Sequence, residues 1–83
     1  MKHEFFSTTE QAEGAIPNGS RVRKVNSQPT DFHQDGALGT VLGSLINPGL
    51  EHKFFHIKYL YFIEWDSHRG IPVAIVSFKI IEQ

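Results

Sequence analysis

The sequence predicts an all-β domain built from five short strands. Three observations indicate this class: apolar residues alternate with a period of two along several segments, glycine and proline punctuate the chain between them, and no segment sustains the 3.6-residue period of an amphipathic helix. The chain has 83 residues, which suits a single domain with a small core. Because an open sheet of this size would expose its edges, we expect the sheet to close into a barrel.

Composition narrows the classes of function. The chain holds no cysteine, which excludes disulfides, thiolate metal sites and a cysteine nucleophile. Eight basic and nine acidic residues give a net charge of -1, whereas domains that hold nucleic acid electrostatically usually carry a basic excess. No apolar run approaches the roughly 18 residues of a membrane span, and the first residues lack the apolar run of a signal peptide. We therefore expect a soluble cytoplasmic protein.

The chain divides into a tail and a domain. Residues 1–17 are polar and irregular, and we expect them to form a poorly defined N-terminal extension to a domain over residues 18–83. Ser7 and Glu10 have the spacing of a capping box, which allows a short helical turn over about residues 8–13. A frayed tail is the equal alternative.

The first strand is expected over residues 20–26. Its apolar residues Val22 and Val25 are three apart rather than two, which predicts a bulge near Arg23–Lys24 or an early end to the strand. A polar loop over residues 27–36 follows.

Residues 37–46 are expected to form the second strand. Val41 would face the core, with Gly39 and Gly43 on the same parity. Glycine within a strand marks a bend or a close backbone approach, both of which a strongly coiled sheet needs. A second long loop, residues 47–56, leads to the third strand.

The third strand, residues 59–66, has two unlike faces. One parity is large and mostly apolar, so it should face the core, whereas the other passes from apolar to acidic. A short turn then leads to a fourth strand over residues 71–76, one tight helical turn at residues 77–79 and a closing strand over residues 80–83. The expected core set is Val22, Val41, Tyr61, Ile63, Trp65, Val73, Ile75 and Ile80.

Two segments carry a recognisable pattern, "NGSRVRKV…DGALGTVLG" at residues 18–43 and "YFIEWDSHRGIPVAIVSFKI" at residues 61–80. The first has basic residues alternating with valine after a glycine, then Gly36, Gly39 and Val41 as a Gly-x-x-Gly-x-Val turn. The second has an aromatic strand ending in Trp-Asp, a short turn, a Val-rich strand, a tight helical turn and a last strand. Both resemble the SH3-like small barrels, in particular the KOW type of translation and transcription proteins.

The resemblance implies a five-stranded SH3-like barrel over residues 18–83. It implies little about function, because such barrels host peptide binders, RNA binders, methyl-lysine readers and subunits of enzymes. The aromatic start and tandem Trp pair of the peptide-binding branch are absent, which argues against recognition of proline-rich peptides.

A surplus of apolar residues favours a non-enzymatic binding module without a cofactor. Apolar residues beyond the core set need cover, either from the segment around Phe5 and Phe6 or from a partner, since large exposed apolar patches usually mark an interface. We therefore expect a protein partner or a homodimer to bind the third strand and the loop before it. The residues expected to take part are Phe54, Phe55, Leu60 and Phe62.

A nucleic-acid-binding barrel is the alternative. Arg21, Arg23 and Lys24 form the dense basic cluster of the chain, and with Phe32 as a stacking surface they could follow a phosphate backbone. The competing interpretation is a solvated strand face whose charges discourage edge pairing.

A site around His33 is the least favoured hypothesis. Asp31, His33 and Asp35 alternate, so in an extended loop they would converge as oxygen and imidazole ligands for an ion such as Zn²⁺ or Mn²⁺. An Asp-His pair also suits general acid-base chemistry, but no serine stands in a nucleophile context. The competing interpretation is a polar loop whose side chains bind local backbone groups. Further metal ligands would have to come from His52, His56 or His68.

Overall fold

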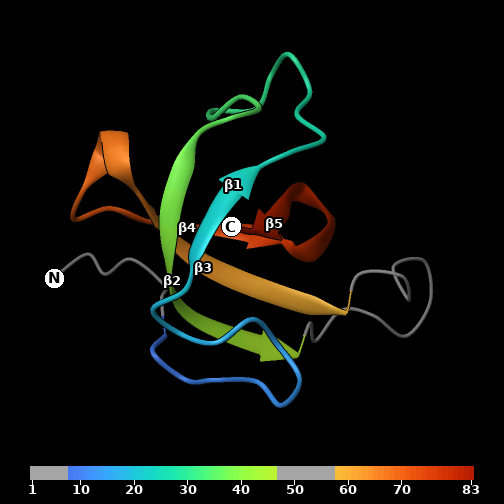
Figure 1. The fold of residues 1–83 in the computed structure, drawn as a ribbon, viewed down its shortest axis with the longest axis vertical. Helices are drawn as coiled ribbons and strands as arrows, with labels where there is room; N and C mark the ends of the chain where they lie inside the picture. The colour runs from blue at the N-terminus through green and yellow to red at the C-terminus, as the bar shows by residue number, and fades with distance from the viewer. Residues whose placement is uncertain (1–7, 47–57) are drawn as a thin grey trace, which may run out of the picture.

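The computed structural model describes residues 8–46 and 58–83. In these residues five strands form one antiparallel sheet with the order β4-β3-β2-β1-β5 (Figure 1). The all-β class is confirmed, but the described edge strands β4 and β5 do not pair with each other, so closure into a barrel stays a prediction. The elements are β1 (Arg21–Lys24), β2 (Leu38–Ile46), β3 (Tyr59–Trp65), the 3-10 turn η1 (Asp66–His68), β4 (Pro72–Val76), the 3-10 turn η2 (Ser77–Lys79) and β5 (Ile80–Glu82).

Strand β1 ends early, as one of the two expected outcomes, and the reason is a buried lysine. Val22 and Lys24 point to the same side and are both almost fully buried, while Arg21 and Arg23 are exposed. The inward position after Val22 therefore belongs to Lys24 and not to Val25. Alternation along the strand is preserved without a bulge.

The bulge lies in β2 instead. The register between β2 and β3 shifts between Val41 and Gly43, which leaves one extra residue in β2 and adds local twist. Both glycines of this strand allow close approach, as expected. A Cβ on Gly39 would lie 2.7 Å from Cγ2 of Ile63, and a Cβ on Gly43 would overlap the carbonyl oxygen of Thr8.

The described part of the N-terminal extension packs on the sheet. The amide of Ser44 in β2 donates to the carbonyl of Glu10 at 2.8 Å, and the amide of Ile16 donates to the hydroxyl of Tyr61 at 3.0 Å. Residues 8–17 are not helical. They follow the sheet because its backbone and tyrosine groups supply partners that a free tail would lack.

The core confirms the predicted alternation. Its three members in β3, Tyr61, Ile63 and Trp65, alternate along the strand, and they meet Val22 of β1 and Val41 of β2 in the same interior. No helix in the described residues has the length and hydropathy that a membrane crossing requires. The buried cluster comprises Val22, Val41, Tyr61, Ile63, Trp65 and Ile80, with Val73 and Ile75 partly buried against it.

Candidate binding cleft

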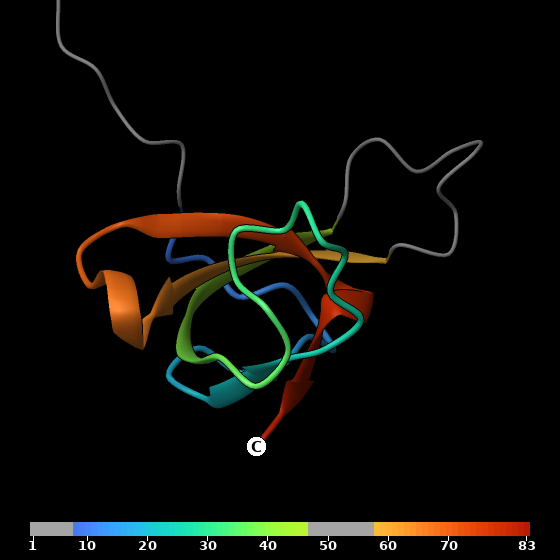
Figure 2. The ribbon, with the colours of Figure 1, turned by 90° about the horizontal axis from the view of Figure 1, so that it is seen from above.

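A cleft of about 290 Å³ is lined by residues of edge strand β4 and of the β1–β2 loop, residues 25–37. The backbones of this loop and of β4 can be followed in Figure 2. Four consecutive residues, Val73–Val76, line the cleft. Because neighbouring residues in a strand point to opposite faces, this means that the edge of β4, rather than one of its faces, borders the cleft. The other lining residues are Lys24, Asp31, Phe32, His33, Trp65 and Lys79.

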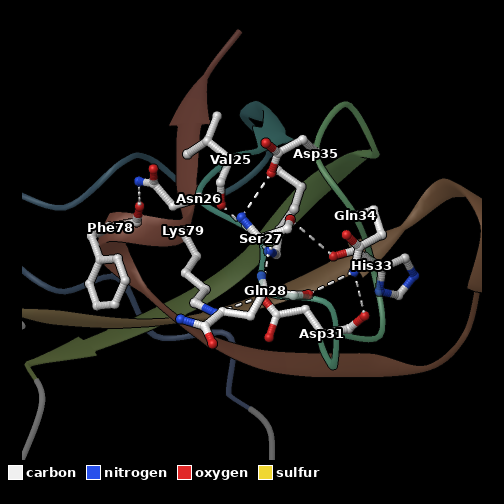
Figure 3. A network of polar contacts seen from close by, with 11 residues as sticks. Val25, Asn26, Ser27, Gln28, Asp31, His33, Gln34, Asp35, Phe78 and Lys79 are labelled. Atoms are coloured by element: carbon white, nitrogen blue, oxygen red, sulfur yellow. Dashed lines mark hydrogen bonds and ion pairs between the residues drawn. The ribbon is translucent and has the colours of Figure 1, made fainter.

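Two lysines and one aspartate meet in the cleft. Nζ of Lys24, a residue only 2% exposed, donates to Oδ2 of Asp31 at 3.0 Å and to the hydroxyl of Ser27 at 2.7 Å. Nζ of Lys79 donates to the same carboxylate oxygen at 2.5 Å, and the amide of Gln28 donates to it at 3.1 Å (Figure 3). The hydrogen bonds from Lys79, Gln28 and Lys24, in that order, hold the pKa of Asp31 well below its ordinary value.

Aromatic side chains form another wall. The imidazole of His33 stacks on the indole of Trp65 with ring centres 4.8 Å apart and planes inclined by 23°. Nε2 of His33 lies 3.1 Å from Nδ1 of His68, within hydrogen-bond distance. Phe32 packs edge-on against His33 and is 73% exposed. Burial, followed by the charges of His68 and Lys24, lowers the pKa of His33.

The β1–β2 loop is held in place by contacts distant in sequence. Asn26 adopts a φ of +55°, a conformation that asparagine tolerates better than most residues, and its side-chain amide donates to the carbonyl of Phe78 in η2 at 2.7 Å (Figure 3). Oδ1 of Asp35 accepts from the amide of Ser27 at 2.9 Å. The loop is thereby tied to itself and to the turn that follows β4, so both sides of the cleft have fixed positions.

The candidate metal ligands do not converge. Asp31 bonds the two lysines, Asp35 accepts from the amide of Ser27, and the imidazole of His33 stacks on Trp65. Residues 8–46 and 58–83 contain no group of three side chains able to hold a metal ion. Convergence of the three side chains would require an extended loop, but the loop is folded. Asp35 instead bonds a backbone amide of its own loop, as the competing interpretation expects. Of the further histidines, His68 does reach His33, while His52 and His56 lie outside the described residues.

The basic cluster is split between two faces, which corrects the expected nucleic-acid surface. Alternation along β1 turns Lys24 into the cleft, away from Arg21 and Arg23. The guanidinium of Arg21 also forms a bidentate ion pair with Asp66, with N···O distances of 2.8 and 2.5 Å. This pairing raises the pKa of Arg21 and lowers that of Asp66. Phe32, the expected stacking residue, lines the cleft together with Lys24.

The expected partner-binding residues of β3 are not an exposed patch. Phe62 is fully buried and Leu60 is half-buried, so Phe62 already has the cover that a surplus apolar residue was expected to need, without a partner. At its centre β3 is covered on both faces, because Tyr61, Phe62 and Ile63 are all buried in succession. Phe54 and Phe55 lie outside the described residues.

Sequence reasoning missed the roles of Lys24 and Lys79, although the parity of Val22 in β1 could have placed Lys24 inside. Pro72 lies at the first position of edge strand β4, where its missing N–H removes no internal ladder hydrogen bond. Comparison of the chain with protein-family models, with curated proteins and with solved structures finds no match. The geometry of the cleft is therefore the basis on which a function can be inferred.

Acidification is expected to destabilise the fold through His33. Because its folded-state pKa lies below the ordinary value of 6.5, the unfolded chain takes up a proton first as the pH falls below about 6.5. The contribution is fully present above that pH and is lost as the pH drops through the folded-state pKa. In urea titrations at pH 7 and pH 5, His33→Phe, which keeps a stacking ring, should lose less stability on acidification than the wild type. An equal loss in both proteins would contradict this role for His33.

Proposed function

We propose that this protein is a non-enzymatic binding module that takes an extended segment of a partner protein into the cleft along β4. The observation that carries this proposal is an edge strand bordering a cleft whose opposite wall holds an exposed aromatic ring, Phe32. No described strand pairs with the outer edge of β4, so its backbone groups can form hydrogen bonds with an added strand. Strand addition of this kind is a recurrent mode of peptide recognition.

The edge lacks the usual protection against such pairing. Natural edge strands are commonly blocked by lysine, by a bulge or by proline. Strand β4, with the sequence PVAIV, carries no charge, and its register with β3 is regular. Its proline is at the first position, which leaves the following residues able to donate. Five residues at about 3.3 Å each match an extended ligand segment of similar length.

The proposal includes an SH3-like barrel over residues 18–83, with the cleft at its seam. Three features support the barrel: the order of the five strands, the bulge in β2 that increases its twist, and the helical turn η2 between β4 and β5. In a barrel with an incomplete seam, the place where strands fail to pair is also the place where a ligand strand fits.

The test begins with a selection of peptides from a random nine-residue display library against the full chain. Dissociation constants of selected peptides are then measured by the fluorescence of Trp65, the single tryptophan of the chain, which lines the cleft. Phe32→Ala should weaken binding by about tenfold, as expected for an aromatic anchor at an interface. Ala74→Lys adds a long charged side chain at an exposed position of the β4 edge and should weaken binding at least as much.

Ile81→Ala is the matched control, because Ile81 is a partly exposed residue of the other edge strand, β5. Its affinity for the peptides should equal that of the wild type. Sedimentation of the chain without peptide establishes whether a second copy occupies the cleft. A library that yields no peptide enriched over an empty surface, or peptides that Ala74→Lys binds as tightly as the wild type, would refute the proposal.

A further inference from the structure

We propose that the cleft selects segments that carry an acidic side chain, and that the ammonium group of Lys79 binds its carboxylate. This inference rests on the proposed function, since it names a feature of the same ligand. It comes from the unequal supply of hydrogen-bond donors and acceptors in the cleft.

Donors exceed acceptors at Asp31. One oxygen of this carboxylate, Oδ2, accepts from Lys24, from Lys79 and from the amide of Gln28. Lys24 has further acceptors in Ser27 and in the carbonyl of Val25. Lys79, by contrast, finds one acceptor, Asp31, among the described residues. Its ammonium group has three N–H donors. Two donors of Lys79 therefore remain for a ligand.

The charges of the lining are also unequal. Lys24 and Lys79 contribute two positive charges and Asp31 one negative charge, which leaves one positive charge in excess. Asp35, the other carboxylate of the loop, is not part of the lining; it accepts from the amide of Ser27, and hydrogen bonding from Ser27, more than the charge of Lys24, lowers its pKa. Asp31 is the counter-charge that both ammonium groups share, and one of them, Lys24, is almost fully buried, where an incompletely compensated charge is costly. A carboxylate from the ligand would balance this excess.

The position of Lys79 sets where the acidic residue belongs. Lys79 lies in η2, which follows β4 directly, and its side chain is 16% exposed. A segment paired with β4 passes Lys79 at the end next to Val76 and is distant from it at the end next to Pro72. The preference for Asp or Glu should therefore fall on one position of the ligand.

The test uses the same display library with the wild type, Lys79→Met and Lys79→Arg in parallel. The wild type and Lys79→Arg should enrich Asp or Glu at one peptide position, and Lys79→Met should select peptides without that enrichment. For a peptide selected by the wild type, replacing its acidic residue by the corresponding amide should weaken binding by about tenfold or more, as for a hydrogen bond between charged groups. With Lys79→Met the two peptides should bind equally.

The outcomes separate this inference from the proposed function. Peptides that depend on Phe32 but show no acidic preference would overturn the role of Lys79 and leave the peptide cleft standing. If Ala74→Lys binds no peptide, and the wild type but not Lys79→Met selects peptides with Asp or Glu at one position, the proposed function and the role of Lys79 are both supported. An acidic preference that persists in Lys79→Met would place the anion site elsewhere and overturn the inference, and Lys79→Arg shows whether charge, rather than altered folding, is responsible.

Discussion

Trp65→Ala is expected to lower the free energy of unfolding by about 3–5 kcal/mol, the usual cost of removing a large buried aromatic side chain. Trp65 is fully buried, lies in the core cluster and supports the stacked ring of His33. A loss of this size is comparable with the whole stability of many small domains, about 5–15 kcal/mol. The variant should therefore be largely unfolded or should melt far below the wild type in circular dichroism.

Trp65→Phe provides the sharper comparison. In the described part of the chain, the indole Nε1 of Trp65 is buried without a hydrogen-bond acceptor. Replacement by phenylalanine removes no hydrogen bond and keeps a ring in the core, so its cost should be clearly smaller than that of Trp65→Ala, although the smaller ring leaves some cavity. If Trp65→Phe destabilises the protein as much as Trp65→Ala, the indole nitrogen is bonded and the geometry of the cleft is different from that described.

Asp31→Asn is expected to have the second large effect, a clear fall in the urea midpoint at pH 7. The substitution removes the counter-charge of two ammonium groups, one of which, Lys24, is almost fully buried. Removing one partner of a buried ion pair is strongly destabilising when the other charge is left buried without a counter-charge. Lys24→Met, which leaves the pair of Asp31 and Lys79 intact, should therefore be much less harmful.

The pH dependence gives an independent measure of Asp31. Its folded-state pKa is lowered, so its contribution to stability is present above about pH 3.8 and is lost as the pH falls further. The difference in urea midpoint between wild type and Asp31→Asn should thus shrink from pH 5 to pH 2. Asp66→Asn, which breaks the exposed ion pair with Arg21, is the control and should have little effect at pH 7. Equal effects of Asp31→Asn and Asp66→Asn would contradict the account.

The core was predictable because one rule governs it. Alternation places Val22, Val41, Ile63 and Trp65 on the inner side of their strands, independently of the conformation of the loops. The tight turn at residues 77–79 follows from its place between two strands. The burial of Lys24 followed from the same rule, but a charged residue is rarely expected inside, and the apolar Val25 beside it misled the interpretation.

The candidate site was less predictable because it depends on contacts between distant segments. Besides its local partners, Asp31 bonds Lys79, which is 48 residues away, and the loop is tied to η2 through Asn26 and Phe78. Local spacing therefore placed Asp31 and His33 in one ligand set, although they face different partners. The burial of Phe62 is similar, since its parity alone indicated only that it lies opposite the core set.

The most direct test of the central claim, that a partner segment binds along β4, is a ¹⁵N–¹H correlation spectrum of the chain titrated with a selected peptide. The account predicts that the largest shifts fall on the amides of residues 31–33, 73–76 and 79, on both sides of the cleft. Shifts concentrated instead on Arg21 and Arg23, or on β5, with the amides of β4 unchanged, would contradict it.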